Sequence, residues 1–250
     1  MDNLLKFYID GEWTAPASDT TMPVFNPATE EQIGTVAMGN SSDVDNAVAA
    51  AKAAFESFSQ TSKADRLELL HRLKNVTKKR IEDLAQAMCV EMGAPISMAR
   101  DAQAAAAVGH LQGFIDALEM HEERTTLANG DILMREPIGV CGLITPWNWP
   151  INQIALKVIP ALATGCTMVL KPSEIAPLSA ILFAEMIDEA GFPAGVFNLV
   201  NGDGAGVGSL MSGHPDIDLI SFTGSTRAGR LILEKASHTI KRVCLELGGK

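Results

Sequence analysis

The spacing of apolar residues changes along the chain, from a helical period in the first half to a strand-and-helix alternation in the second. Between residues 44 and 120, apolar side chains recur every three or four residues, which places them on one face of a helix. This pattern predicts helices over residues 44–58, 62–76 and 97–120, preceded by short strands at residues 7–9 and 24–27.

Polar pairs predict where the first helices begin and end. Ser42 with Asp45, and Ser62 with Asp65, have the spacing of a capping box, in which each side chain accepts a hydrogen bond from the other residue's backbone. Residues 93–95, Gly-Ala-Pro, predict a helix end.

A hairpin is predicted between the two halves. Asn129-Gly130 is a strong signal for a two-residue turn, and it is flanked by Thr-Thr-Leu at residues 125–127 and Ile-Leu-Met at residues 132–134. Two interpretations are open, a plain surface hairpin or an arm that reaches a neighbouring subunit.

Beyond residue 138, short apolar runs alternate with helical stretches. The predicted strands cover residues 140–145, 167–170, 196–200, 219–222 and 243–247. The predicted helices cover residues 150–163, 178–190, 204–211 and 228–237. This alternation is typical of an α/β protein with a mostly parallel sheet and helices on both faces.

Composition narrows the classes of partner. The formal charge of −10 argues against nucleic acid, which needs clustered Lys and Arg. The longest apolar region, residues 138–170, is broken by prolines, asparagines and a lysine, so no membrane span is predicted. The four cysteines form no CxxC pair and the histidines lack ligand spacing, which predicts free thiols, no metal site and a cytoplasmic location.

The loops that follow the predicted strands carry the candidate chemistry, because open parallel sheets bind ligands at the carboxyl ends of their strands. These loops are residues 146–150, 171–174, 201–204, 223–226 and 248–250. They contain glycines, small hydroxyls and one Lys–Glu pair, which suit a ligand with phosphate and ribose. A GxGxxG fingerprint is absent after the first of these strands, and Gly-rich residues 202–206 are on their own a weak signal, more often a flexible turn.

Four of these segments together resemble one family. PWNWP at 146–150, KPSE at 171–174, FTGST at 222–226 and ELGGK at 246–250 occur in the order and spacing of the aldehyde dehydrogenase superfamily. The resemblance runs nearly without interruption from residue 141, and residues 1–140 also fit it. It implies a Rossmann-like five-stranded parallel sheet with flanking helices, N-terminal strands and helices, and a hairpin arm.

The same resemblance implies a division of the chain into parts. Residues 1–123 would be the N-terminal strands and helices of the NAD-binding domain, 124–137 the oligomerisation arm, 138–247 the Rossmann-like core and 248–250 the start of a catalytic domain.

The resemblance implies NAD as cofactor. The implied cofactor-binding residues are Thr145, Pro146, Trp147, Lys171, Ser173, Glu174, Gly204, Gly208, Phe222, Thr223, Gly224, Ser225, Leu247 and Gly248. Lys171 and Glu174 would hold the adenosine ribose, the alternative being a surface ion pair. Ser225 would donate to the pyrophosphate from a helix start. Trp147 would contact the cofactor or, alternatively, belong to the core.

Two implied catalytic residues complete the resemblance. Asn148 would donate to the oxyanion formed when a thiolate adds to an aldehyde, or would otherwise brace its loop. Glu246 would be the general base that activates water against an acyl-enzyme thioester. A lone buried carboxylate on a strand would otherwise be costly.

The family's nucleophilic cysteine follows ELGGK by a few dozen residues, and no cysteine of these 250 residues stands in a matching motif. Cys244 shares a strand face with Glu246, whose charge disfavours the thiolate form. The complete enzyme would be a homo-oligomer that oxidises a small-molecule aldehyde to a carboxylic acid with NAD, whereas this chain alone is predicted to be inactive. A non-catalytic nucleotide-binding or regulatory module is the alternative.

Overall fold

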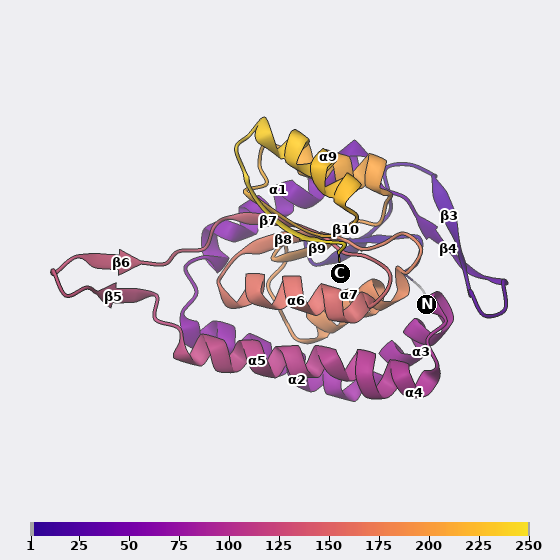
Figure 1. The fold of residues 1–250 in the computed structure, drawn as a ribbon, viewed down its shortest axis with the longest axis horizontal. Coiled ribbons are helices and arrows are strands. Elements are labelled where there is room, and N and C mark those ends of the chain that lie inside the picture. The colour runs from indigo at the N-terminus through magenta and orange to yellow at the C-terminus, as the bar shows by residue number, and fades with distance from the viewer. Residues whose placement is uncertain (1–2, 250) are drawn as a thin grey trace.

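The computed structural model describes residues 3–249 and is built around one seven-stranded sheet (Figure 1). Its strands lie in the order β11-β10-β7-β8-β9-β1-β2. Their bounds are β1 Phe7–Ile9, β2 Glu12–Thr14, β7 Val140–Ile144, β8 Thr167–Lys171, β9 Phe197–Leu199, β10 Leu219–Gly224 and β11 Arg242–Leu247.

The five strands from the second half are parallel to one another, which confirms the predicted fold class. β7 lies at the centre, with Cys141 opposite Met168 of β8 on one side and opposite Leu219 of β10 on the other. β11 pairs with β10 and β9 pairs with β8, also in parallel. All five carboxyl ends therefore meet along one edge of the sheet.

Two N-terminal strands extend this sheet, which the sequence pattern did not predict. β1 pairs antiparallel with β9 through Tyr8 and Leu199, and β2 pairs antiparallel with β1. Side chains fix the junction, because Tyr8 Oη donates to Asp188 at 3.0 Å and the Asp10 amide donates to Asn198 Oδ1 at 3.0 Å. The sheet is thus completed by N-terminal strands that pair with a strand from the second half of the chain.

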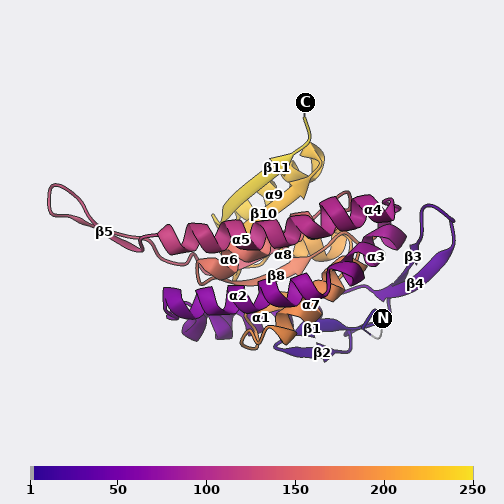
Figure 2. The ribbon, with the colours of Figure 1, turned by 90° about the horizontal axis from the view of Figure 1, so that it is seen from below.

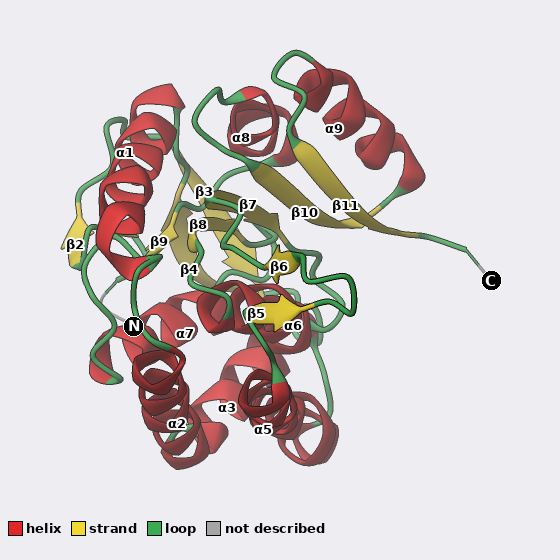
Figure 3. Cartoon of the chain, turned by 90° about the vertical axis from the view of Figure 1, so that its left-hand side faces the viewer, coloured by secondary structure: helices red, strands yellow, loops and turns green. Residues whose placement is uncertain are grey.

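Helices cover both faces of the sheet (Figure 3). The helices on one face are α1 Ser41–Phe58, α8 Ser209–Gly213 and α9 Thr226–Ser237. The helices on the other face are α2 Lys63–Lys79, α3 Ile81–Met92, α5 Ala105–Met120, α6 Pro150–Ala163 and α7 Leu178–Glu189. Strand residues alternate between two cores: Val140 and Ile144 pack with the first group, whereas Cys141 and Leu143 pack with the second. The four cysteines are free thiols.

The start of α1 corrects one sequence prediction. Its capping box uses Asn40 and Asp43, two residues before the predicted pair Ser42 and Asp45. Asn40 Oδ1 accepts from the Ser42 amide at 2.8 Å, and Asp43 Oδ2 accepts from the Asn40 amide at 2.9 Å. Asp43 is favoured because its other oxygen accepts from the Ala17 amide at 2.8 Å, which anchors the helix start to the preceding segment. The box predicted at Ser62 and Asp65 is confirmed.

The helix predicted over residues 97–120 is interrupted, which is a second correction. A short helix, α4 Ile96–Met98, leads into the π-helical segment Ala99–Ala104, and α5 follows. The helix end predicted at residues 93–95 is confirmed, because Gly93 ends α3 with a φ of 73°.

The predicted hairpin is present and projects from the body of the protein (Figures 1 and 2). It consists of β5 Arg124–Thr126 and β6 Ile132–Met134, which pair only with each other. Ile132, Leu133 and Met134 are all exposed. A second separate hairpin, β3 Thr21–Phe25 with β4 Gln32–Ala37, lies at the opposite end of the molecule.

We expect the β5–β6 hairpin to make the chain associate, because apolar side chains and unpaired strand edges together favour pairing with another chain. Sedimentation of the wild-type chain should shift to larger species as concentration rises. Replacing Ile132 and Met134 with Lys should remove the shift, whereas Ile240→Lys, at an exposed apolar site outside the hairpin, should not. A wild-type chain that stays monomeric over a wide concentration range would contradict this expectation.

Among residues 3–249, no helix has both the length and the apolar composition that a membrane span requires.

Candidate functional site

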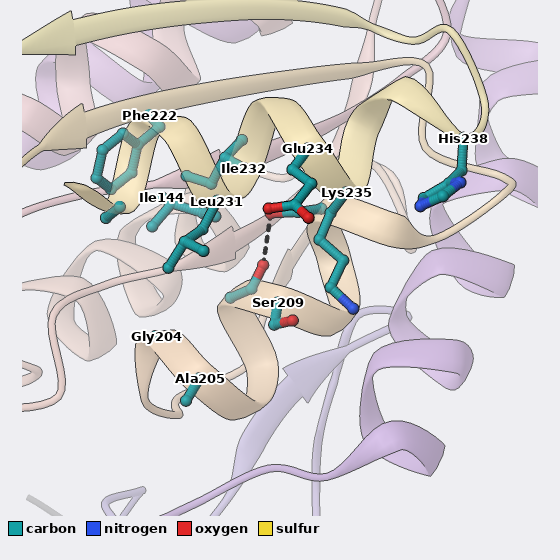
Figure 4. A pocket seen from close by; sticks show the side chains of 13 residues that line it. Ile144, Gly204, Ala205, Ser209, Phe222, Leu231, Ile232, Glu234, Lys235 and His238 are labelled. Carbon is teal, nitrogen blue, oxygen red and sulfur yellow. Dashed lines mark hydrogen bonds between the residues drawn. The ribbon is translucent and has the colours of Figure 1, made fainter. Parts of the chain in front are cut away.

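The carboxyl edge of the sheet opens into a pocket of 560 Å³ between α8 and α9 (Figure 4). Its floor contains Ile144 and Phe222, which end β7 and lie in β10. Leu231 and Ile232 of α9 form one wall, and the π-helical segment Gly204–Gly208 begins the other. The remaining lining residues are Ser209, Ser212, Ala228, Glu234, Lys235 and His238. An aliphatic slot with polar groups at its margin suits a flat, partly polar ring.

Lys171 lies beside this pocket and is buried, with only 3% of its surface exposed. Its Nζ donates to three oxygens, the carbonyls of Pro172 at 2.8 Å and Gly202 at 2.6 Å and Glu174 Oε2 at 3.1 Å. Every ammonium proton is therefore used. The alternative of a surface ion pair is wrong, because a surface lysine would not be enclosed by backbone carbonyls.

Burial lowers the pKa of Lys171, and the nearby charges of Glu174 and Asp203 oppose that shift. The carboxylate of Glu174 is part-exposed at 30% of its side chain. Glu174 Oε2 is thus held by the buried ammonium of Lys171. The Glu174 carboxylate is therefore fixed in place while part of it remains open to solvent. Such a fixed carboxylate can accept hydrogen bonds from vicinal hydroxyls.

Two short glycine-rich turns shape the pocket. Asp203 accepts from the Gly206 amide at 2.5 Å, which starts the π-helical segment, and a Cβ at Gly208 would lie 3.7 Å from the Lys171 side chain. On the opposite side, Ser225 Oγ accepts from the Ala228 amide at 3.2 Å and caps α9. The helix predicted over residues 204–211 was wrong in its type and in its end. The structure has the π-helical segment Gly204–Gly208 followed by α8, which ends at Gly213.

Two buried hydroxyls at neighbouring strand ends have no hydrogen-bond partner within the described part of the chain. They are Thr145 Oγ1, just after β7, and Thr223 Oγ1 in β10. The Thr145 amide does have a partner, the Lys171 carbonyl at 3.1 Å. A buried hydroxyl without a partner carries a desolvation cost of about 1–3 kcal/mol, and a polar ligand along this edge would remove it.

The loop after β7 exposes both of its implied functional side chains. Trp147 is 52% exposed, so the alternative that it belongs to the core is wrong. Asn148 is also exposed, and none of the side-chain hydrogen bonds found among residues 3–249 involves it. No contact therefore supports the alternative that Asn148 braces its loop, and its side-chain amide is free to donate a hydrogen bond. Pro146 and Ser173 lie at the starts of the two neighbouring loops.

Glu246 is exposed on β11, which corrects the expectation of a lone buried carboxylate. β11 lies at the edge of the sheet, so its outer side is uncovered. Burial lowers the pKa of Lys157 of α6, and the charge of Glu246 opposes that shift. Lys157 Nζ donates to Ser221 Oγ at 3.1 Å, and Ser221 and Thr223 of β10 are in register with Cys244 and Glu246 of β11. Glu246 and Cys244 therefore face the α6 side of the sheet together.

The structure brings some of the implied site residues together at the pocket and leaves others away from it. Gly204, Gly208 and Phe222 line the pocket, with Lys171 packed directly behind Gly208. Asn148, Glu246, Leu247 and Gly248 are exposed and do not line the pocket between α8 and α9, while Lys250 lies outside the described residues. Gly224 packs against the Phe222 ring.

Sequence reasoning missed the pocket wall formed by α9. Leu231, Ile232, Glu234, Lys235 and His238 line it, although their spacing is that of any amphipathic helix. The available signal was the position of this helix directly after the FTGST turn, which places its start at the carboxyl edge of the sheet.

The fold is that of a doubly wound α/β protein, with a pocket at the carboxyl edge of its sheet, where such folds bind ligands. The sequence profile of the aldehyde dehydrogenase family matches residues 13–250, and the chain belongs to that family.

Individual relatives agree with this assignment. The chain is 53% identical to a 3-succinoylsemialdehyde-pyridine dehydrogenase from a Pseudomonas species, with all of this chain and 52% of the relative aligned. It is 48% identical to a putative aldehyde dehydrogenase from Staphylococcus aureus, again with 52% of the relative aligned. The chain thus spans about half the length of the curated relatives it matches.

Solved structures give the same picture. A mutant of aldehyde dehydrogenase C from Pseudomonas syringae, in complex with NAD⁺ and octanal, superposes with a TM-score of 0.98 and 54% identity. The match covers 100% of this chain and 51% of that one. Betaine aldehyde dehydrogenase from Staphylococcus aureus, in complex with NAD⁺, superposes with a TM-score of 0.94 and 36% identity over 98% of this chain and 50% of that one.

Proposed function

We propose that this chain is the NAD-binding part of an enzyme that oxidises an aldehyde to a carboxylic acid. The observation that carries the proposal is the 560 Å³ slot between α8 and α9, placed beside a buried Lys171 that fixes Glu174. The homologous structures from Pseudomonas syringae and Staphylococcus aureus contain NAD⁺, which supports the same choice of cofactor.

Each group along the carboxyl edge fits one portion of a dinucleotide. The aliphatic slot would take the adenine ring between Ile232 and the segment Gly204–Gly208, and Glu174 would accept from the hydroxyls of the adenosine ribose. Ser225 and the amides that start α9 would face the pyrophosphate. The unpartnered hydroxyls of Thr145 and Thr223 would gain partners along the rest of the cofactor.

The reaction would draw two further groups from this chain. Bound NAD supplies the acceptor for a hydride. Asn148 would donate its amide proton toward the aldehyde oxygen as that atom gains negative charge, because a fixed donor is worth most where charge develops. Glu246 would take a proton from water during release of the acid. Both side chains are exposed here, so neither is yet enclosed in a dry site.

Blocking the slot tests the proposal. In calorimetry, Ser209→Trp should weaken NAD binding by about 30-fold, since burial of an aromatic base contributes about 2 kcal/mol at 25 cal/mol per Å². Leu210→Trp is the matched control, because Leu210 is the next residue of α8, is exposed and does not line the slot. Equal NAD affinity in the two variants would refute the placement of the adenine ring.

Two broader properties belong to the same proposal. A small-molecule aldehyde is the proposed substrate, and the complete enzyme is proposed to be a cytoplasmic homo-oligomer. The free thiols support a reducing compartment, and the exposed β5–β6 hairpin supports association between subunits.

A further inference from the structure

Glu91, near the end of α3, is a buried carboxylate in contact with a distant helix. It is 4% exposed, and its three hydrogen bonds all come from the first turn of α7. Glu91 Oε2 accepts from the Leu178 amide at 2.5 Å, and Oε1 accepts from the Ser179 amide at 3.1 Å. The Ser179 hydroxyl also donates to Oε1.

These bonds replace the cap that α7 lacks in its own sequence. The residue at its N-cap position is Pro177, which makes no side-chain cap bond. The amides at a helix start have no partner within the helix, so an outside acceptor is required. A carboxylate also interacts favourably with the positive end of the helix dipole. Glu91 therefore fixes the place where α7 begins.

The segment held in this way is the one that carries Glu174. Only residues 175–177 separate Glu174 from Leu178, and the Ala176 amide donates to the Ser173 carbonyl at 3.2 Å, which tightens the turn between them. Ile175 of this segment lines a 220 Å³ apolar pocket together with Glu91 and Trp147. The KPSE loop is thus anchored at one end by Lys171 and at the other by Glu91.

Burial raises the pKa of Glu91 to about 7, although the three hydrogen bonds pull it downward. The ionised form is the one that can accept from three donors at once. Assays at about pH 8 therefore keep the carboxylate ionised and the contact complete.

We propose that Glu91 is a positioning residue for cofactor selection: by capping α7 it holds Glu174 where that carboxylate accepts from a ribose 2′-hydroxyl and excludes a 2′-phosphate. The inference rests on the proposed function, because it assigns Glu174 to the ribose. Glu91 itself lines none of the slot between α8 and α9 and acts through the loop.

The test uses Glu91→Gln and the milder Ser179→Ala, with Asp43→Asn as control. Asp43 is also a buried carboxylate that caps a helix and joins two segments, but it lies on α1, away from the KPSE loop. Two quantities are measured at about pH 8, the NAD and NADP dissociation constants by calorimetry and hydrogen exchange at the Ala176 amide.

Glu91→Gln should weaken NAD binding about tenfold, the effect of reducing the competent loop conformation to about a tenth of the population. NADP binding should not weaken, because the displaced Glu174 no longer repels the 2′-phosphate. The ratio of the NAD and NADP affinities should therefore narrow, and the Ala176 amide should exchange faster. Ser179→Ala should shift both readouts in the same direction by less. Asp43→Asn should leave the ratio and the Ala176 amide unchanged.

Three results would each contradict one part of the proposal. If Ala176 stays protected in both loop variants, the positioning role is wrong whether or not NAD binds. If Ala176 exchanges faster but the NAD-to-NADP ratio does not move, the role in selection is wrong. If the wild-type chain binds neither cofactor, the proposed function fails, and the Ala176 exchange still decides whether Glu91 positions the loop.

Discussion

A preparation of residues 1–250 saturated with NAD is expected to form no NADH from any aldehyde. The chain offers Asn148 as a donor and Glu246 as a base, both exposed, and no thiol in the family's catalytic motif. Without a covalent acceptor, hydride would have to leave a free aldehyde hydrate. General-base assistance contributes only about 10²–10⁴-fold, which leaves most of the barrier in place.

The measurement is NADH absorbance with several aldehydes, and Cys244 supplies the control. This thiol is exposed on β11 and lies on the same strand face as Glu246. Activity that survives Cys244→Ser would show that another group carries the reaction. Activity that is lost with Cys244→Ser would make Cys244 the nucleophile, and either result would contradict the expected inactivity. Supplying the C-terminal half of a homologous dehydrogenase in trans should restore turnover if the halves dock, and Glu246→Gln should then block thioester hydrolysis.

The chain is expected to bind NAD more tightly than NADP. The 2′-phosphate of NADP would approach Glu174, whose other side is fixed by Lys171. Two like charges about 4 Å apart near a surface repel by about 4 kcal/mol before screening, and solvent around the part-exposed Glu174 reduces that value. Calorimetry with both cofactors measures the difference directly.

Glu174→Gln should narrow the gap between the cofactors, because the neutral amide keeps an acceptor and loses the charge. Glu189→Gln is the matched control, since it removes one negative charge from the exposed end of α7 and leaves the KPSE loop intact. NADP affinity equal to or greater than NAD affinity in the wild-type chain would overturn the assignment of Glu174.

The parallel sheet was predictable because its signals are local. Each strand is a short apolar run, and most helices between them have their own period, so the strands and helices of residues 138–247 could be predicted from the sequence, apart from the π-helical segment Gly204–Gly208. The antiparallel edge was not predictable in this way. Nothing in Phe7–Ile9 indicates that its partner is Phe197–Leu199, because that pairing depends on where the whole chain returns.

The candidate site was also predictable only where its signals are local in the sequence. The motif at residues 171–174 indicated a Lys–Glu pair, but the burial of Lys171 depends on the Gly202 carbonyl, which the next strand brings back to it. The slot between α8 and α9 likewise needs two helices from different parts of the sequence. Glu91 left no signal in the sequence, because its partners Leu178 and Ser179 lie on another helix.

The pairing of β1 with β9 also has a consequence for folding during synthesis of the chain. Tyr8 leaves the ribosome long before Leu199, so the apolar strand Phe7–Ile9 must wait, without its partner, while nearly two hundred further residues are synthesised. A contact between such distant residues is slow to form, and the edge of β1 that β9 will cover is open to aggregation until it does, although β2 can already pair with the other edge. Chaperones that bind short apolar segments would find one here during that interval. The pairing of a strand made early in synthesis therefore depends on a strand made nearly two hundred residues later.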